Sequence, residues 1–230
     1  MADLGLWGEA AGWYPDIVAC GAAHDAWQVE FDRHGSLIRA QPRESANPRT
    51  AIAVNGERNA YLVLSPWERK FILSLRTERA VMLGGHTPDM AIVADAAQAW
   101  LSGARPSVVA AAWPFLGSVA LASARERGDH REASWLHLYE NHREDRVAAR
   151  LQPFVSLAFQ EPRLRRLTPY TSVWTLHFST TSTWPYTGAH PAVVPTETPG
   201  RYIVASSDRR RRDETDAVGA LRLVLNAVPD

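Results

Sequence analysis

The sequence predicts an α+β protein in which antiparallel sheets are covered by helices, and three observations lead to this prediction. Short runs of alternating apolar and polar residues fill the first 85 positions, as in an antiparallel meander. After Thr87 the apolar residues recur at three-four spacing, as in an amphipathic helix. The same order, strands and then a helix preceded by threonine, recurs near the C-terminus.

The N-terminal strands are separated by turn signals. Residues 26–41 alternate on both sides of His34 and Gly35, which predicts a hairpin whose turn uses the positive φ open to glycine. Further short strands, bounded by Asn-Gly, Ser-Pro and Thr-Glu steps, are expected at residues 51–54, 61–64, 71–76 and 80–83.

Two helices have clear start signals. Thr87 is expected to cap a helix over residues 88–102, and Pro88 suits its first position. Thr215 is expected to cap a second helix. The apolar face of that helix would consist of Val218, Leu221, Val224, Leu225 and Val228.

The chain is divided on this basis into a meander with its helix at residues 1–103, a helical segment at 104–160 and a strand-rich unit at 161–230. Strands in the last part are expected at 173–179, 192–194 and 201–205. Because a helix follows strands in both halves, the sequence leaves open two similar sheet-plus-helix halves or one packed domain.

Composition narrows the class of protein. Lys plus Arg equals Asp plus Glu at 25 each, so no global field favours nucleic acid or an anionic membrane. Residues 107–124 lack charge, but Pro114 and Gly117 interrupt them, which favours buried segments around a turn over a membrane span. The N-terminal residues do not have the order of a signal peptide, so a cytoplasmic location is expected.

Several segments resemble one family. The most specific are EPRLR at 161–165, the TS and HFS steps that follow, and WPYT at 184–187. They are similar to the actinobacterial domain of unknown function 6193, whose members are usually labelled natural product biosynthesis proteins. The resemblance spans roughly residues 60–230 and implies a pathway, not a reaction. Where the family is expected to have His-Gly, this chain has Val173 and Trp174, so no role tied to that histidine is carried over.

Arginines open the block that we single out as a candidate site. Arg163 and Arg165 follow Pro162 at an expected helix start, where their guanidinium groups could hold a carboxylate or phosphate bidentately. The alternative is that neighbouring carboxylates pair with them and fix the helix to the sheet.

Aromatic and hydroxyl side chains fill the rest of the block. Substrate contacts are expected from Tyr170, Ser172 and Trp184, because aromatic walls and hydroxyls suit a small amphipathic ligand. A strand from 173 to 179 would turn Trp174 toward the core and His177 away from it. His177 and Tyr186 are then the candidate acid and base; the alternative is an exposed histidine beside threonines.

Other chemistry finds little support. The histidines lack the spacing of a metal site, and no glycine-rich phosphate loop or nucleophile elbow occurs, so neither metal nor cofactor is expected. Cys20 lies among apolar residues, as an inert buried thiol would, and it has no cysteine partner. The basic run at 208–214 has acidic residues at both ends, which is typical of a solvated loop.

Two functions of different class remain open. One is an accessory enzyme of a bacterial secondary-metabolite pathway, acting on a small acidic or amphipathic intermediate by acid/base chemistry. The other is a non-catalytic binding or immunity-like protein that recruits or shields a pathway partner. Trp7, Trp13 and Trp67 lie outside the core periodicity and support the second, because tryptophan concentrates at interfaces. Either function is compatible with a homodimer.

Overall fold

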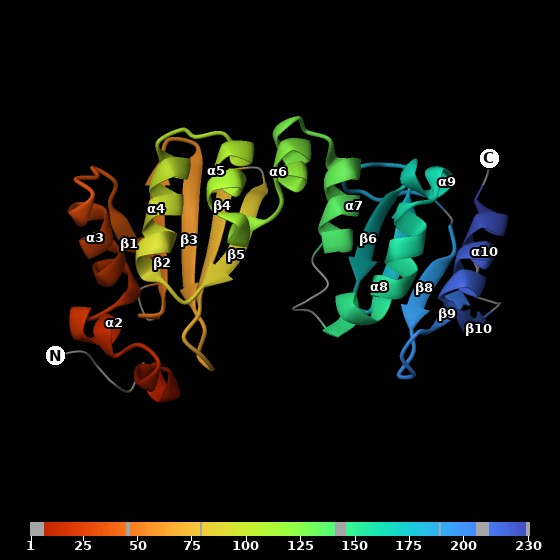
Figure 1. Ribbon diagram of the computed structural model, residues 1–230, viewed down its shortest axis with the longest axis horizontal. Helices are drawn as coiled ribbons and strands as arrows, with labels where there is room; N and C mark the ends of the chain where they lie inside the picture. The colour runs from red at the N-terminus through yellow and green to blue at the C-terminus, as the bar shows by residue number, and fades with distance from the viewer. Residues whose placement is uncertain are drawn as a thin grey trace. The chain divides into compact units, whose positions relative to one another are not determined.

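The computed structural model describes residues 7–44, 47–78, 80–140, 146–188, 190–205 and 212–228. The chain divides into two compact units, Met1–Glu126 and Arg127–Asp230, called unit 1 and unit 2 below (Figure 1). Each unit has helices and one five-stranded antiparallel sheet, which confirms the α+β class. The segment 104–160 contributes helices to both units, because the division falls inside it.

Unit 1 is a meander with helices before and after it. Its first helices are η1 (Gly8–Gly12), α2 (Pro15–Cys20) and α3 (Ala23–Arg33). The strands lie in sequence order in the sheet, as β1 (Ala40–Pro42), β2 (Thr50–Asn55), β3 (Arg58–Leu64), β4 (Phe71–Thr77) and β5 (Val81–Thr87). The last helices are α4 (Met90–Leu101), α5 (Pro106–Ala112), η2 (Pro114–Leu116) and α6 (Val119–Glu126).

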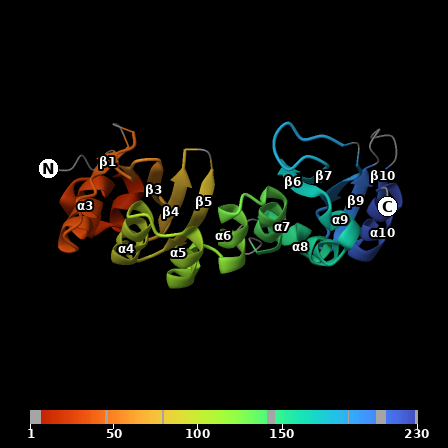
Figure 2. The ribbon, with the colours of Figure 1, turned by 90° about the horizontal axis from the view of Figure 1, so that it is seen from above.

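The core of unit 1 lies between the helices and one face of the sheet (Figure 2). Alternate residues of β3, Ala60, Leu62 and Leu64, are buried there, so Tyr61 and Val63 belong to the opposite face. The backbone of η2 lies very close to Gly85 of β5. A Cβ at this position would lie 1.7 Å from the carbonyl oxygen of Phe115. Glycine is therefore required for η2 to pack on the sheet.

Unit 2 repeats this plan. Its helices α7 (His130–Glu140), α8 (Arg146–Phe159) and α9 (Pro162–Arg165) precede the sheet. The strands again follow sequence order, as β6 (Thr168–Ser172), β7 (Thr175–Ser179), β8 (Ala192–Pro195), β9 (Arg201–Ala205) and β10 (Arg212–Asp216). The helix α10 (Ala217–Ala227) follows β10 directly.

In both units an aspartate caps the helix that follows the meander. Asp89 Oδ1 accepts a hydrogen bond from the amide of Ala91 at 2.9 Å, and Asp216 Oδ1 accepts one from Gly219 at 2.8 Å. The expected caps Thr87 and Thr215 are wrong, since both threonines lie in the preceding strand. The shared order of helices, five strands and an Asp-capped helix is the order that two similar halves would have.

The hairpin expected at residues 26–41 is wrong, because α3 occupies the first half of this segment. The same apolar residues satisfy both periods: Trp27 and Phe31 are four apart, and both are fully buried against the sheet. Gly35 does have a positive φ of 63°, but it follows the end of a helix and not a strand.

Three expectations about burial also change. Cys20 is exposed, because it ends α2 on the surface. Trp7 is buried against Tyr14, so it belongs to the core, whereas Trp13 and Trp67 are exposed. Val218 is 66% exposed, because the buried face of α10 is made by Gly219, Ala220 and Val224.

Residues 107–124 form α5, η2 and the start of α6, in agreement with buried segments around a turn. Across the described parts of the chain, no helix has the length and apolar character needed to cross a membrane. Most of the basic run at 208–214 lies outside the described residues; β10 begins at Arg212.

The hydroxyl of Tyr14 holds the β3–β4 turn of unit 1. It accepts a hydrogen bond from the amide of Lys70 at 2.9 Å and lies 2.8–3.0 Å from the carbonyl oxygens of Ser65, Glu68 and Lys70. The ring is fully buried, and its centroid lies 5.5 Å from that of Phe71. Burial raises the pKa of this hydroxyl.

We expect Tyr14→Phe to lower the free energy of unfolding of unit 1 by about 1–3 kcal/mol, because buried backbone groups lose their partner. Amide exchange at Lys70 and urea denaturation followed by circular dichroism measure the effect. Tyr61→Phe is the matched control, because the Tyr61 hydroxyl has no hydrogen bond to the described residues. Equal stability of the two variants would contradict the role given to Tyr14.

Candidate functional site

The candidate site is built on the β6–β7 hairpin of unit 2. The expected single strand from 173 to 179 is wrong: Ser172 pairs with Thr175, and Val173 and Trp174 form a two-residue turn between two strands. Val173 has a φ of +56°, which is unfavourable for a β-branched residue and is usually left to glycine in such turns. The turn places both side chains in solvent, with Trp174 60% exposed and not in the core.

Side chains of the β6–β7 hairpin lie on both faces of the unit 2 sheet. Leu176 and Phe178 are buried against the helices together with Trp135 and Phe154. Tyr170 and His177 lie directly opposite each other in the strand register, and they belong to the other, open face because side chains alternate along a strand. The expected orientation of His177, away from the core, therefore agrees with its position.

Four rings on the open face form one column. The centroids of Tyr170 and His177 are 5.1 Å apart with the rings nearly parallel, and those of Tyr170 and Tyr186 are 4.2 Å apart at an angle of 10°. Trp184 meets the Tyr186 ring edge-on at 6.2 Å. These arrangements are the ones that aromatic quadrupoles favour.

The segment after β7 carries two of these rings and is tied to the sheet by Ser179. The buried Ser179 Oγ accepts hydrogen bonds from the amides of Thr181 at 3.1 Å and Thr187 at 3.0 Å. Thr181 Oγ1 donates to the carbonyl oxygen of Pro185 at 3.0 Å, and the Trp184–Pro185 peptide bond is cis. Figure 2 shows this segment on the face of the sheet opposite the helices.

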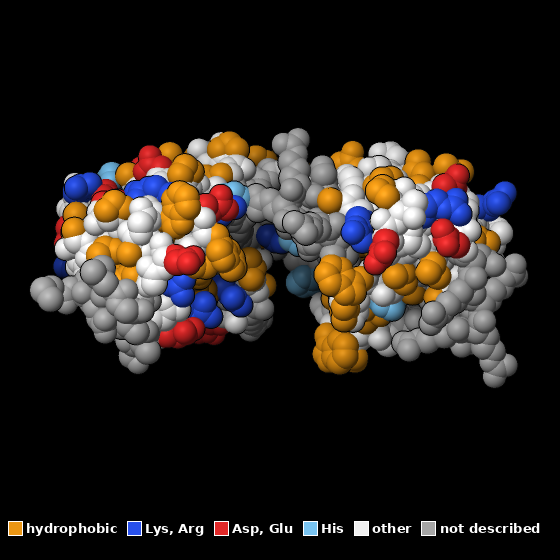
Figure 3. All heavy atoms as spheres, turned by 90° about the horizontal axis from the view of Figure 1, so that it is seen from below, with side chains coloured by type: hydrophobic (Ala, Val, Ile, Leu, Met, Phe, Trp, Pro, Cys, Tyr) orange, Lys and Arg blue, Asp and Glu red, His pale blue; other side chains and the backbone are white. Residues whose placement is uncertain are grey.

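We call Tyr170, His177, Trp184 and Tyr186, with Val173 and Trp174 of the turn, the aromatic surface. Trp184 lies at the end of the aromatic surface and is 82% exposed. Figure 3 shows hydrophobic side chains protruding from the rim of unit 2. Sequence reasoning found four of these residues by their type. It missed the turn residues, for which the run Thr-Ser-Val-Trp-Thr between apolar alternations was the available signal.

The two arginines predicted to bind substrate lie among the helices. Arg165 pairs with Glu132 of α7, and its guanidinium carbon lies 4.2 Å from the ring centroid of Phe159. Arg163 donates to the carbonyl oxygen of Val228. Both therefore lie on the helical side of the sheet, away from the aromatic surface, whereas Ser172 is exposed at the end of β6 beside the turn.

His190 lies where the segment after β7 meets β8. Both ring nitrogens are buried without a hydrogen-bond partner in the described residues, and burial lowers the pKa of the imidazole. The ring packs against Gly188, where a Cβ would lie 2.8 Å from it. Gly188 thus allows the chain to pass this ring.

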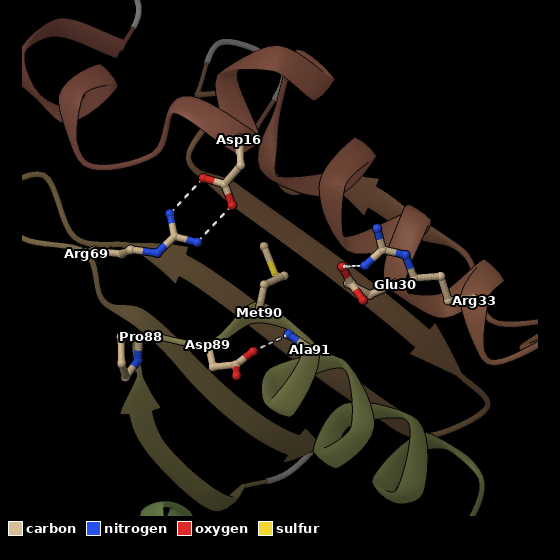
Figure 4. Close-up of a pocket in the computed structure, with 8 residues that line it drawn as sticks. All are labelled: Asp16, Glu30, Arg33, Arg69, Pro88, Asp89, Met90 and Ala91. Carbon is tan, nitrogen blue, oxygen red and sulfur yellow. Dashed lines mark hydrogen bonds and ion pairs between the residues drawn. The ribbon is translucent and has the colours of Figure 1, made fainter.

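A separate cleft of about 540 Å³ lies in unit 1 (Figure 4). Its walls come from α2, α3, the β3–β4 turn and the start of α4, through Asp16, Glu30, Arg33, Arg69, Pro88, Asp89, Met90 and Ala91. Arg69 pairs bidentately with Asp16 at 2.7 and 2.8 Å, and this hydrogen bonding lowers the pKa of the Asp16 carboxyl. Glu30 pairs with Arg33, and Asp89 caps α4.

Each arginine of the cleft therefore has a carboxylate partner within its walls, and the Asp89 carboxylate is held by backbone amides of α4. None of the residues predicted as a site lines it. In the part of the chain that the structure describes, no three His, Cys, Asp or Glu side chains gather as ligands of a metal ion would.

Unit 2 is thus a small α+β unit with helices on one face of its sheet and an aromatic surface on the other. Residues 130–230 match the model of a family described as "Family of unknown function (DUF6193)". The match begins with α7 and supports the family resemblance over unit 2; residues 60–129, which the resemblance also took in, lie outside it. Comparison with curated proteins and with solved structures gives no match.

Arg165→Gln is expected to lower the free energy of unfolding of unit 2 by about 1–2 kcal/mol, because it removes an ion pair and a cation–π contact together. The neighbouring Arg166 is exposed, so Arg166→Gln should change stability by less than about 0.5 kcal/mol. Urea denaturation of the two variants measures the difference. A stability loss no greater for Arg165→Gln than for Arg166→Gln would contradict a structural role.

Because the His190 imidazole is buried, we predict that unit 2 loses stability in mild acid. Its folded-state pKa is lowered, so below the ordinary value of 6.5 the unfolded chain takes up a proton that the folded chain does not. The resulting loss in the free energy of unfolding is absent above pH 6.5 and grows as the pH falls toward the folded-state pKa. Thermal denaturation between pH 7.5 and 5 should show a shallower loss for His190→Phe, and an unchanged slope for His130→Phe at the exposed start of α7.

Proposed function

We propose that this protein is a non-catalytic binding module that docks a partner protein on the aromatic surface of unit 2. The observation that carries the proposal is Trp184, a large aromatic side chain that is 82% exposed although its segment is tied to the sheet. The few residues that carry most of the binding energy at protein interfaces are enriched in tryptophan, tyrosine and arginine.

Preorganisation supports the same proposal. The Tyr186 ring is stacked on Tyr170 and meets Trp184 edge-on, so a partner would find these rings already in position. Rings fixed before binding lose little conformational entropy when they bind. Arg201 of β9 pairs with Glu214 of β10, so these two charges of the sheet compensate each other.

The family resemblance indicates the pathway in which the partner would act. We place the partner in an actinobacterial natural-product pathway, as an enzyme that this protein recruits or shields in the cytoplasm. This context depends on the resemblance, whereas the choice of surface depends on the residues described above.

An acid/base enzyme is the second candidate, and the place of His177 in the ring column favours it. A small amphipathic intermediate would then lie against the rings, with His177 and Tyr186 exchanging protons with it. In this case His177→Gln would abolish turnover of such an intermediate, whereas a binding module would show no turnover for the substitution to remove.

We expect a photo-crosslinking amino acid at position 173 of the aromatic surface, where Val173 is 83% exposed and Trp184 is kept, to capture one partner polypeptide in extracts of the source organism, identified by mass spectrometry. With that partner purified, Trp184→Ala should weaken binding about 30-fold or more in calorimetry, as loss of a side chain worth 2 kcal/mol would do.

The matched control is Trp67, which is also exposed but lies in unit 1. The crosslinker at position 67 should not capture the same polypeptide, and Trp67→Ala should leave its affinity unchanged. Equal capture at both positions, or equal affinity of Trp184→Ala and the unsubstituted protein, would refute the proposal.

A further inference from the structure

The open face of the unit 1 sheet is a second surface with unusual chemistry. Tyr61 of β3 lies at its centre, with Ile52 of β2 and Ser74 of β4 directly beside it in the register. The next row places Val63 beside Ile72, which is 41% exposed, and β2 adds Val54 at 50%. The helices of unit 1 lie on the other face, so this row of apolar side chains faces solvent.

Two arginines converge on the Tyr61 ring. The guanidinium carbon of Arg43, just after β1, lies 4.8 Å from the ring centroid, and that of Arg76 on β4 lies 5.3 Å from it. One ring thus holds two cations close together through cation–π contacts. Because both distances are measured to the same centroid, the two guanidinium carbons lie no more than about 10 Å apart. This is about the Debye length at 0.1 M salt, so the repulsion between the two like charges is only partly screened.

Of the other arginines around this sheet, three have acceptors for their side chains, whereas the buried Nε of Arg49 has none in the described residues. Arg39 and Arg69 pair with carboxylates, and Arg58 donates to two backbone carbonyl oxygens. In the described residues, neither Arg43 nor Arg76 has a carboxylate within ion-pair distance or a hydrogen-bond acceptor. Within the described residues, the guanidinium groups of Arg43 and Arg76 therefore lie beside exposed apolar side chains and have no carboxylate partner.

We propose that the open face of the unit 1 sheet, centred on Tyr61, binds an acidic segment of a partner protein that carries aliphatic or aromatic side chains next to its carboxylates. The guanidinium groups of Arg43 and Arg76 donate bidentate hydrogen bonds to the carboxylates, and Ile52, Val63 and Ile72 contact the apolar side chains of the segment. Figure 3 shows basic, acidic and hydrophobic side chains close together on unit 1.

Charge argues against two other occupants. A second copy docked by the same face would bring the four guanidinium groups of an isologous interface together without carboxylates. Nucleic acid would meet two free cations on an aliphatic surface, whereas phosphate backbones are bound by many basic side chains. An acidic, apolar protein segment matches both the charge and the aliphatic row. This proposal stands independently of the aromatic surface of unit 2.

The test is a selection of random twelve-residue peptides displayed on phage against the full chain, followed by fluorescence anisotropy with the enriched peptides. Enriched sequences are expected to combine Asp or Glu with Leu, Ile or Phe. Arg43→Gln with Arg76→Gln should weaken their binding at least tenfold. Arg33→Gln with Arg39→Gln removes the same charge from arginines that already have acidic partners, and it should change binding less than twofold.

A charge reversal sharpens the test. Arg43→Glu with Arg76→Glu should lose the acidic peptides and enrich basic ones, provided that circular dichroism shows the native fold; Ile72→Ser should weaken the acidic peptides and keep the fold. Enrichment of neutral or basic peptides, no enrichment, or equal loss in both glutamine pairs would overturn the proposal. So would a dimer in analytical ultracentrifugation that Ile72→Ser dissociates, or tighter binding of a DNA duplex than of the peptides.

Discussion

Each sheet of this protein is covered by helices on one face only, and the two candidate surfaces follow from that constraint. A five-stranded meander alternates its side chains between two faces, while the helices before and after it pack on the same one. Half of the strand residues must therefore face water or a partner. In a small antiparallel unit the open face is where binding groups can be displayed without disturbing the core.

The two units use their open faces differently. In unit 2, the segment after β7 folds back over the sheet, is held by Ser179 and adds the rings of Trp184 and Tyr186 to those of the strands. In unit 1, a single ring, that of Tyr61, lies between two arginines and a row of aliphatic side chains. The first surface is aromatic and nearly uncharged, and the second is basic and aliphatic. Different chemistry on equivalent faces is what two binding sites for different partners require.

Much of the fold could be predicted from local patterns, and the errors have a common cause. The strands β2 to β5 were found because turn residues separate short apolar alternations. The segment from Ala23 to Arg33 was assigned to a hairpin because Trp27 and Phe31 fit a period of two as well as a helical repeat. Only the packing of both rings under the sheet decides between these periods. The prediction of threonine caps was wrong because an aspartate one or two residues further along caps each helix.

The sequence by itself determined the α+β class, the strands β2 to β5, β8 and β9, the helices α4 and α10, and the block 168–187 as the place where aromatic and hydroxyl side chains gather. Only the tertiary structure decided which of them meet. Cross-strand register brought Tyr170 next to His177, a turn exposed Trp174, and the hydrogen bonds of Ser179 carried Tyr186 onto Tyr170. Arg165, close in sequence, lies among the helices instead. The physical reason is that residue type fixes what a side chain can bind, whereas pairing and burial fix what it can reach.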